Sequence, residues 1–214
     1  MSEQVEETEL TWERLLLLNK YAVEEIYTKL KILNEEFSHQ QSNNPIEHIK
    51  TRVKNKESII RKLESKGIDP TPENAHRHLG DIAGVRLISA FTSDIYTLFE
   101  ALKRQDDLDI IKVKDYIKHS KPNGYQSLHI LVEVPIFLAA GRRPMRVEIQ
   151  IRTIAMDFWA SLEHKLYYKY DINVPQHIGD ELKECASIIN DLDKRMLEIK
   201  SQIDHYGKVY GKRP

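Results

Sequence analysis

The side chains best suited to chemistry alternate along a predicted strand, MRVEIQIR, at residues 145–152. Because successive side chains of a strand point to opposite faces, its polar residues share one face: Arg146, Glu148, Gln150 and Arg152. The same period places three more polar side chains on one face of the preceding predicted strand: Tyr125, Ser127 and His129. Such a set could stack on a planar ring, position a hydroxyl group and hold a metal ion. A solvated sheet face is the alternative, although it is typically richer in Lys, Thr and Glu.

A further carboxylate, Asp81, precedes a small Ala-Gly pair and a predicted strand at 85–91. At the entry to a strand, an Asp is often no more than a turn former. If Asp81 faces Glu148, however, the two carboxylates would suit Mg²⁺, which takes one or two carboxylates together with substrate phosphates. Neither glycine-rich phosphate-loop motif occurs in the sequence. The residues therefore favour a Mg²⁺-dependent enzyme that acts on phosphate-bearing nucleotides without such a loop.

The net charge conceals where the charges lie. The chain holds 32 Lys and Arg against 33 Asp and Glu, and the resulting formal net charge of -1 by itself argues against a polyanionic ligand. The basic residues are nevertheless concentrated in three clusters, at 50–66, 112–121 and 142–152, whereas seven of the first 25 residues are Glu. One such cluster is usually a solvated face, but three in one domain favour a site for a polyanion.

The first basic cluster predicts a helix that opens at Pro45 and runs to about Lys66. On that helix, Lys54, Ser58 and Lys62 are four residues apart and therefore lie on one face. Two ammonium groups with a hydroxyl between them suit a chain of phosphates, which needs point charges and hydrogen-bond donors.

The helices and strands that must position these residues can be predicted from the sequence, and together they indicate an α+β fold. A helix is expected at 11–37, where apolar residues recur at alternating steps of three and four. Short β-branched segments predict strands at 85–91, 109–117, 128–137 and 145–152. A helix is expected at about 93–104, a hairpin loop at 139–144, and another helix from the N-cap Thr153 to about Tyr170. We expect a mixed sheet of about five strands flanked by helices.

The last section predicts one long helix. From Ile178 to Tyr210, apolar residues repeat at steps of four and three over more than four heptads. A helix of about 50 Å, at about 1.5 Å per residue, could pack along its own domain or form a seam with another chain. We expect oligomerisation, and we divide the chain into an N-terminal helical segment at 1–44, a central domain at 45–172 and a C-terminal oligomerisation helix at 173–214.

Composition excludes several other classes of protein. Hydrophobic residues make up 41% and charged residues 30%, which is the balance of a globular protein. The single cysteine, Cys185, excludes a disulfide framework and a multi-cysteine metal site. No apolar run approaches the ~18 residues that cross a membrane. The acidic start, MSEQVEETEL, is unlike a signal peptide, so we expect a cytoplasmic location.

Five stretches resemble the synthetase domain of RelA/SpoT-type proteins. They are RVKNKESIIRK (52–62), DIAGVR (81–86), KVKDYIKHSKPNGYQSLH (112–129), VEIQIRT (147–153) and FWASLEHKLYYK (158–169). The resemblance covers about 45–170 in matching order and implies a nucleotidyltransferase-like fold. With a long helix on each side, the chain is similar to the small alarmone synthetases. Larger relatives carry a hydrolase domain with a His-Asp motif; no His-Asp dipeptide occurs here, so no degradative activity is expected.

The resemblance implies pyrophosphoryl transfer in the stringent response. ATP would donate its β,γ-diphosphate to the 3′-hydroxyl of GDP or GTP, giving ppGpp or pppGpp and AMP. The residues implied for ATP are Arg52 and Arg86 around adenine, with Lys54, Ser58, Lys62 and Lys114 as further contacts. Those implied for GDP or GTP are Lys121, Tyr125, His129, Gln150 and Asp157, with Tyr125 stacked on guanine. Asp81 and Glu148 match the ligands of Mg²⁺, the implied cofactor, and Glu148 also matches the proposed base for the 3′-hydroxyl. A homotetramer without membrane contact is implied as well.

Two positions depart from the family pattern. Lys112 and Lys114 stand where the motif often reads Arg-x-Lys, which keeps the charge but loses the fork geometry of Arg. Asp157 stands where some relatives have a different polar residue. It could accept hydrogen bonds from guanine, or it could be a first-turn residue favoured by the helix dipole.

Two other functions stay open at the level of the sequence. One is a pyrophosphokinase that acts on an adenine nucleotide with the same scaffold. The other is an RNA-binding regulatory module in which the basic clusters contact phosphates and catalysis is secondary. Asp81 and Glu148 count against a purely RNA-binding role, because buried acids among the basic clusters would repel the RNA backbone.

Overall fold

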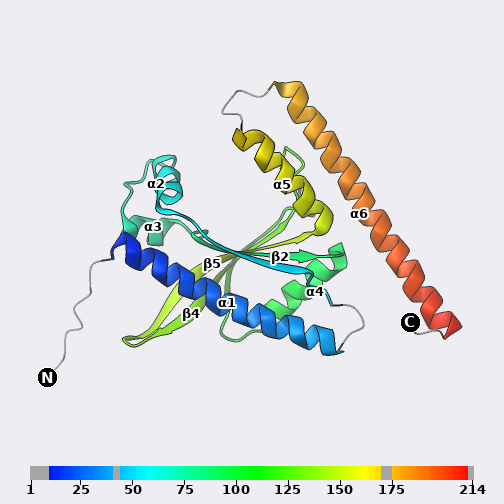
Figure 1. Cartoon of the computed structure of the whole chain (residues 1–214), viewed down its shortest axis with the longest axis horizontal. Coiled ribbons are helices and arrows are strands. Elements are labelled where there is room, and N and C mark those ends of the chain that lie inside the picture. The colour runs from blue at the N-terminus through cyan, green and yellow to red at the C-terminus, as the bar shows by residue number, and fades with distance from the viewer. Residues whose placement is uncertain (1–9, 41–43, 170–174, 212–214) are drawn as a thin grey trace.

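The computed structural model describes residues 10–40, 44–169 and 175–211, in which six helices and five strands are found (Figure 1). In chain order they are α1 (Trp12–Gln40), β1 (His48–Val53), α2 (Lys56–Glu64), α3 (Pro72–His78), β2 (Ala83–Ser89), α4 (Thr92–Lys103), β3 (Asp109–Asp115), β4 (Leu128–Leu138), β5 (Gly141–Thr153), α5 (Ile154–Lys169) and α6 (Gln176–Tyr210).

The five strands form one mixed sheet in the order β1-β2-β5-β4-β3. β2 and β5 run parallel, whereas the other neighbouring strands are antiparallel. β5 is the centre of this sheet and carries the VEIQIRT stretch. The α+β class and the mixed five-stranded sheet expected from the sequence are confirmed.

One face of the sheet is covered by α1, which crosses the strands diagonally in Figure 1. Apolar side chains of α1 and α4 join the inward side chains of the strands in a single core, with Leu30, Leu98, Ile149 and Ile151 all fully buried. Each such side chain contributes about 1.5–3 kcal/mol when it is removed from water. Because this face holds the odd-numbered residues of β5, the even-numbered polar residues are directed to the opposite face.

Smaller apolar clusters fix the helices at the two ends of the sheet. At one end, Ile59 of α2 packs with Ala75 of α3 and Leu15 of α1. At the other end, α5 and α6 lie side by side (Figure 1), and Trp159 Nε1 donates a hydrogen bond to the carbonyl of Leu182 at 3.0 Å. Thr153 caps α5 as expected, because its Oγ1 accepts a hydrogen bond from the backbone N–H of Met156 at 3.1 Å.

The long helix predicted from Pro45 to Lys66 is wrong. Residues 48–53 form β1, which pairs with β2, and α2 begins only at Lys56. Asn55 is the N-cap, and its side chain accepts from the N–H of Ser58 at 2.9 Å. The basic residues continue from β1 into α2, so the charge pattern does not mark the boundary between them. The strand HIKTRV is also too short for its alternation to stand out.

Two further boundaries differ from the predictions. The hairpin loop expected at 139–144 is shorter, because β5 already begins at Gly141, whose φ is 116°. The short helix α3 was not predicted; Thr71 caps it by accepting from the N–H of Asn74. Across the described ranges, every helix is either too short or too polar to pass through a lipid bilayer.

Candidate functional site

Two adjacent rows of residues cross all five strands on the face opposite α1. Directly paired residues of neighbouring strands point to the same face of a sheet. From β1 to β3, the first row is Lys50, Arg86, Gln150, His129 and Lys114. The second row is Arg52, Gly84, Glu148, Leu131 and Lys112. The sheet thus brings onto one surface residues that are distant in the sequence.

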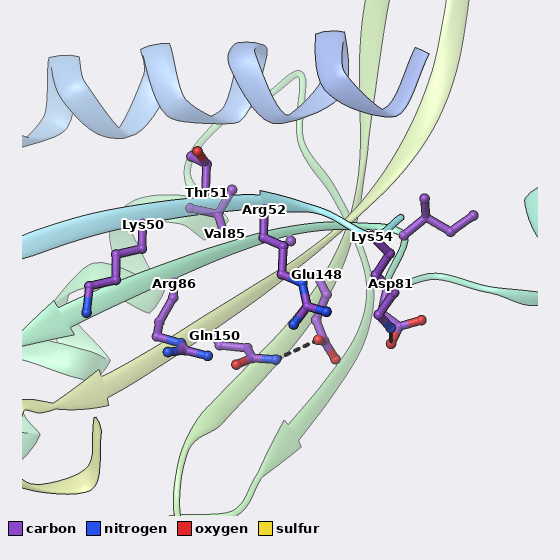
Figure 2. A pocket seen from close by; sticks show the side chains of 11 residues that line it. Lys50, Thr51, Arg52, Lys54, Asp81, Val85, Arg86, Glu148 and Gln150 are labelled. Carbon is purple, nitrogen blue, oxygen red and sulfur yellow. Dashed lines mark hydrogen bonds and ion pairs between the residues drawn. The ribbon is translucent and has the colours of Figure 1, made fainter. Parts of the chain in front are cut away.

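A pocket of about 380 Å³ lies over β1, β2 and β5. In Figure 2, Arg52 and Arg86 extend from neighbouring strands, and Glu148 and Gln150 lie beside them. Lys50 is at one end of this set of side chains, and Asp81 is at the other (Figure 2). Gly84 lines the same pocket, and its lack of a side chain leaves space between these groups.

A second pocket, of about 190 Å³, is lined by basic side chains from α2 and the turn after it, and from α3, β3 and β4. Its lining includes four lysines and two histidines: Lys62, Lys66, Lys112, Lys114, His78 and His129. Asp81 and Glu148 line both pockets. The two carboxylates therefore lie where the two pockets meet.

Asp81 is held by two cations. Both Lys54 Nζ and Lys62 Nζ donate to its Oδ2. Burial raises the pKa of Asp81, but the hydrogen bonds from the two lysines outweigh it, and the pKa lies below its usual value. Burial lowers the pKa of Lys54, and its contact with Asp81 offsets only part of that effect. The carboxylate is therefore ionised and carries two positively charged partners.

Glu148 is positioned by two neighbours in the sheet. His129 Nδ1 lies 3.2 Å from its Oε1, and Gln150 Nε2 donates to its Oε2 at 2.7 Å. Burial raises the pKa of Glu148, yet these two hydrogen bonds outweigh it and leave the pKa below its usual value. The negative charge of Asp81 acts in the opposite direction, so the two carboxylates are close enough to interact. The carboxyl group of Glu148 is therefore ionised.

Tyr125 lies beside the second pocket. Its Oη is 2.7 Å from His129 Nε2, and Lys121 Nζ lies 4.7 Å from the centroid of its ring. The preceding residue, Gly124, has a φ of 88°, and a Cβ there would lie 2.5 Å from the Cβ of Ala186 on α6. The loop that carries Tyr125 is thus packed closely against the C-terminal helix.

Asp157, in the first turn of α5, is paired with three basic side chains. Its Oδ1 accepts from Arg86 Nη1 at 3.1 Å and from Arg152 Nη1 at 3.2 Å, and Lys50 Nζ is 3.5 Å from its Oδ2. Arg152 is buried, although the sequence places it in a basic cluster that resembles a surface. Arg146, on the same strand, donates to the carbonyl of Arg77 at 3.0 Å and lines neither pocket.

The structure brings most of the predicted site residues together. Those that line the first pocket are Arg52, Lys54, Asp81, Arg86, Glu148 and Gln150. Those that line the second are Lys62, Lys114, His129 and the two shared carboxylates. Four predicted residues line neither pocket: Ser58, Lys121, Tyr125 and Asp157. Ser58 Oγ accepts from Arg61 Nη2 at 3.4 Å.

The pockets are also lined by residues that the sequence prediction did not include, among them Lys50, Gly84, Lys66, His78 and Lys112. A helix over 45–66 gives Lys50 no place beside Arg86, whereas strand β1 places the two residues directly opposite each other. Lys112 was noted only as a departure from the family pattern, and the register of β3 places it beside Leu131 in the second row. A strand assignment for 48–53 would have found Lys50 from alternation with Arg52 alone.

Comparisons with known proteins place this chain. The family model described as "Region found in RelA / SpoT proteins" matches residues 51–173. The GTP pyrophosphokinase YwaC of Bacillus subtilis is 51% identical over 193 residues, which cover 90% of this chain and 92% of that protein. Small alarmone synthetase 1 of Bacillus subtilis, solved with its product pppGpp, is similar with a TM-score of 0.84 and 36% identity, covering 90% of this chain and 98% of that one. Its structure bound to AMPCPP matches with a TM-score of 0.76 and 33% identity, covering 90% and 97%. The chain, which carries the RelA/SpoT region between residues 51 and 173, therefore belongs to the RelA/SpoT family.

Proposed function

We propose that this chain is a GTP pyrophosphokinase, which transfers the β,γ-diphosphate of ATP to the 3′-hydroxyl of GDP or GTP and releases AMP. The observation that carries the proposal is the position of Asp81 and Glu148, which line both pockets and so lie where two substrates would meet. The relatives support it, since one is named GTP pyrophosphokinase and another holds pppGpp or AMPCPP.

The first pocket supports the donor site. Arg52 and Arg86 lie on adjacent strands, two residues apart in register, and planar guanidinium groups can stack on a base while they carry charge. Lys54 and Lys62 both pair with Asp81. An arriving triphosphate would compete for these two ammonium groups, because phosphate oxygens are strong acceptors. That exchange would free the carboxylate of Asp81.

Mg²⁺ fits the donor set at the boundary of the two pockets. Among the described residues, no group of three or more His, Cys, Asp or Glu side chains is gathered to enclose a metal ion. Mg²⁺ commonly binds one or two carboxylates and completes its shell with substrate phosphates and water. Asp81 and Glu148 would supply those carboxylates. The bound ion would neutralise charge on the transferred diphosphate.

The second pocket supports the acceptor side of the reaction. His129 lines this pocket, and Tyr125, whose Oη lies 2.7 Å from His129 Nε2, would stack on guanine beside it. Lys121, which lies over the ring of Tyr125, and Gln150, which lines the first pocket, are the further acceptor contacts that the resemblance implies. The lysines of this pocket would bind phosphates as point charges. Glu148 would accept the proton of the 3′-hydroxyl as that oxygen attacks, because it is ionised and fixed by two hydrogen bonds.

The choice of acceptor tests the proposal. ATP and Mg²⁺ are incubated with the protein and GDP, GTP or ADP, and AMP release is measured for each acceptor. We expect AMP with the guanine nucleotides and little with ADP. AMP release with ADP alone would favour a pyrophosphokinase for adenine nucleotides. Steeply salt-dependent RNA binding without any AMP would favour the RNA-binding module.

Replacing Tyr125 by Ala is expected to raise the KM for the guanine acceptor about 5- to 150-fold, since stacking of a base on an aromatic ring contributes about 1–3 kcal/mol. The KM for ATP should change little, because Tyr125 does not line the first pocket. Initial rates measured over both substrate concentrations separate the two effects. An unchanged acceptor KM would remove Tyr125 from the guanine site.

We also propose that α6 joins copies of this chain, and a homotetramer is the assembly that the family resemblance implies. One side of the helix packs on its own domain through Ala186 and Asp193, which are buried. The other side exposes a row of large apolar residues: Ile188, Leu192, Met196, Ile199 and Ile203. A row of this kind on a helix is typical of a protein interface. A cytoplasmic location stays a prediction.

Charged substitutions on this row test the assembly. We expect light scattering coupled to size exclusion to give an oligomeric mass for the wild type and a smaller mass for the double variant Leu192→Asp, Ile199→Asp. Circular dichroism checks that the variant keeps its helices. A wild type that is monomeric at micromolar concentration would refute assembly through α6.

A further inference from the structure

Arg152 is a buried cation that lies outside the lining of both pockets. It is 5% exposed, and it lines neither the first nor the second pocket. Its Nη1 donates to Asp157 Oδ1 at 3.2 Å, while its Nη2 donates to Tyr125 Oη at 2.6 Å and to Gln150 Oε1 at 3.0 Å. Burying a charge costs free energy that a counter-ion and hydrogen bonds must offset. Asp157 supplies the counter-ion, and the second nitrogen is directed at two side chains of the proposed acceptor site.

Five side chains form a closed ring of hydrogen bonds that includes Arg152. From Arg152, one arm runs through Tyr125 Oη to His129 Nε2, and from His129 Nδ1 to Glu148 Oε1. The other arm runs through Gln150, whose Oε1 accepts from Arg152 and whose Nε2 donates to Glu148 Oε2. Both oxygens of the carboxylate proposed as the base are therefore connected to the same guanidinium group.

The direction of the donors in this ring follows from Arg152. A guanidinium group only donates, so Tyr125 Oη and Gln150 Oε1 must both accept from it. Tyr125 Oη keeps its own hydrogen, which it can donate to His129 Nε2 at 2.7 Å; in that arrangement the imidazole hydrogen is on Nδ1, facing Glu148. For Gln150, an accepting Oε1 leaves the amide N–H₂ for the second oxygen of Glu148. His129 and Gln150 can thus both donate to Glu148, because Arg152 donates to the other end of each arm, at Tyr125 Oη and at Gln150 Oε1.

Arg152 is also connected to the donor pocket. The same Oδ1 of Asp157 that accepts from Arg152 accepts from Arg86 at 3.1 Å. Arg86 lines the first pocket, in which we place adenine. The pair Arg152 and Asp157 therefore joins side chains of the proposed acceptor site to an arginine of the proposed donor site.

We propose that Arg152 is a positioning residue of the transfer reaction, which orients His129 and Gln150 so that both donate to Glu148 and holds the ring of Tyr125 at the acceptor site. This inference rests on the proposed function. Arg152 itself does not touch either nucleotide. Its loss changes the alignment of the carboxylate with the attacking hydroxyl, and misplacement of a reacting group by about 1 Å can cost about 100-fold in rate.

Tyr125→Phe isolates one arm of the ring, because it removes the hydroxyl but keeps the aromatic ring. We expect kcat for AMP release to fall roughly 10-fold or more, while the KM for GDP changes by no more than about 2-fold. Arg152→Lys, which keeps a charge but cannot donate in two directions, should lower kcat by at least as much. The double variant should be no slower than the slower single variant, since both changes break one network.

Arg146→Lys is the matched control, because Arg146 lies on the same strand and donates to a backbone carbonyl outside the ring. It should keep kcat within about 2-fold, and thermal unfolding checks that every variant is folded.

Unchanged kcat in Tyr125→Phe and Arg152→Lys, or losses that multiply in the double variant, would overturn the proposal. If Arg152→Lys does not fold, Tyr125→Phe decides alone. A wild type that releases no AMP would refute the proposed function instead, before any variant is compared.

Discussion

Glu148→Gln is expected to lower kcat for AMP release by at least about 10²- to 10⁴-fold, the range that a general base contributes, while GDP binding stays nearly intact. An amide cannot take the proton of the 3′-hydroxyl, and it offers a weaker ligand to Mg²⁺. It has almost the same shape as the carboxylate, and its Oε1 can still accept from His129. Calorimetric titration with GDP and initial rates of AMP release measure the two quantities separately.

Glu133→Gln is the control for this variant. Glu133 lies on β4 opposite Arg146, on the same face of the sheet, but it lines neither pocket. It should leave kcat within about 2-fold, as is usual for substitutions outside a site. Substantial residual synthesis by Glu148→Gln would rule out the assigned role of Glu148, and lost GDP binding would indicate a binding role in place of a catalytic one.

Asp81→Asn is expected to have the second large effect, because Asp81 serves two purposes. Its carboxylate neutralises Lys54 and Lys62, and it is the second proposed ligand of Mg²⁺. We expect kcat at a fixed Mg²⁺ concentration to fall by about 100-fold or more, since a bound metal ion supplies several kcal/mol of charge stabilisation. More Mg²⁺ should restore part of the rate, because one carboxylate is left.

A Mg²⁺ titration of the rate, and of AMPCPP binding, tests this expectation. The concentration of Mg²⁺ needed for half-maximal AMPCPP binding should rise in Asp81→Asn. Asp106→Asn, an exposed change on the loop after α4, should not shift it. An identical Mg²⁺ dependence in Asp81→Asn and the wild type would exclude Asp81 as a metal ligand.

The central part of the site could be predicted because alternation on a strand is a local property. Once 145–152 is a strand, Glu148 and Gln150 must share a face, and the adjacent strand brings His129 beside them. The meeting of Asp81 with Glu148 needed the long-range pairing of β2 with β5, which local sequence does not encode. Only the family resemblance, in which both residues match ligands of Mg²⁺, placed Asp81 and Glu148 in one site.

The remaining parts depend on burial and partner choice. Charge alone could not separate Arg152 from Arg146, although the first is buried in a hydrogen-bonded ring and the second is bonded to a backbone carbonyl. Asp157 looked free to bind guanine, and the fold surrounds it with three cations. Lys50 was hidden by a helix assignment that the pairing of β1 with β2 overrides.

Tracing the transferred group tests the account most directly. ATP labelled at its γ-phosphate is incubated with the protein, Mg²⁺ and GDP, and 3′-deoxyGDP serves as the acceptor that lacks the attacking hydroxyl. The account predicts one AMP for each labelled guanosine product, with the label in a diphosphate on the 3′-oxygen, and no AMP with 3′-deoxyGDP. Release of ADP in place of AMP, or equal AMP release with 3′-deoxyGDP, would contradict it.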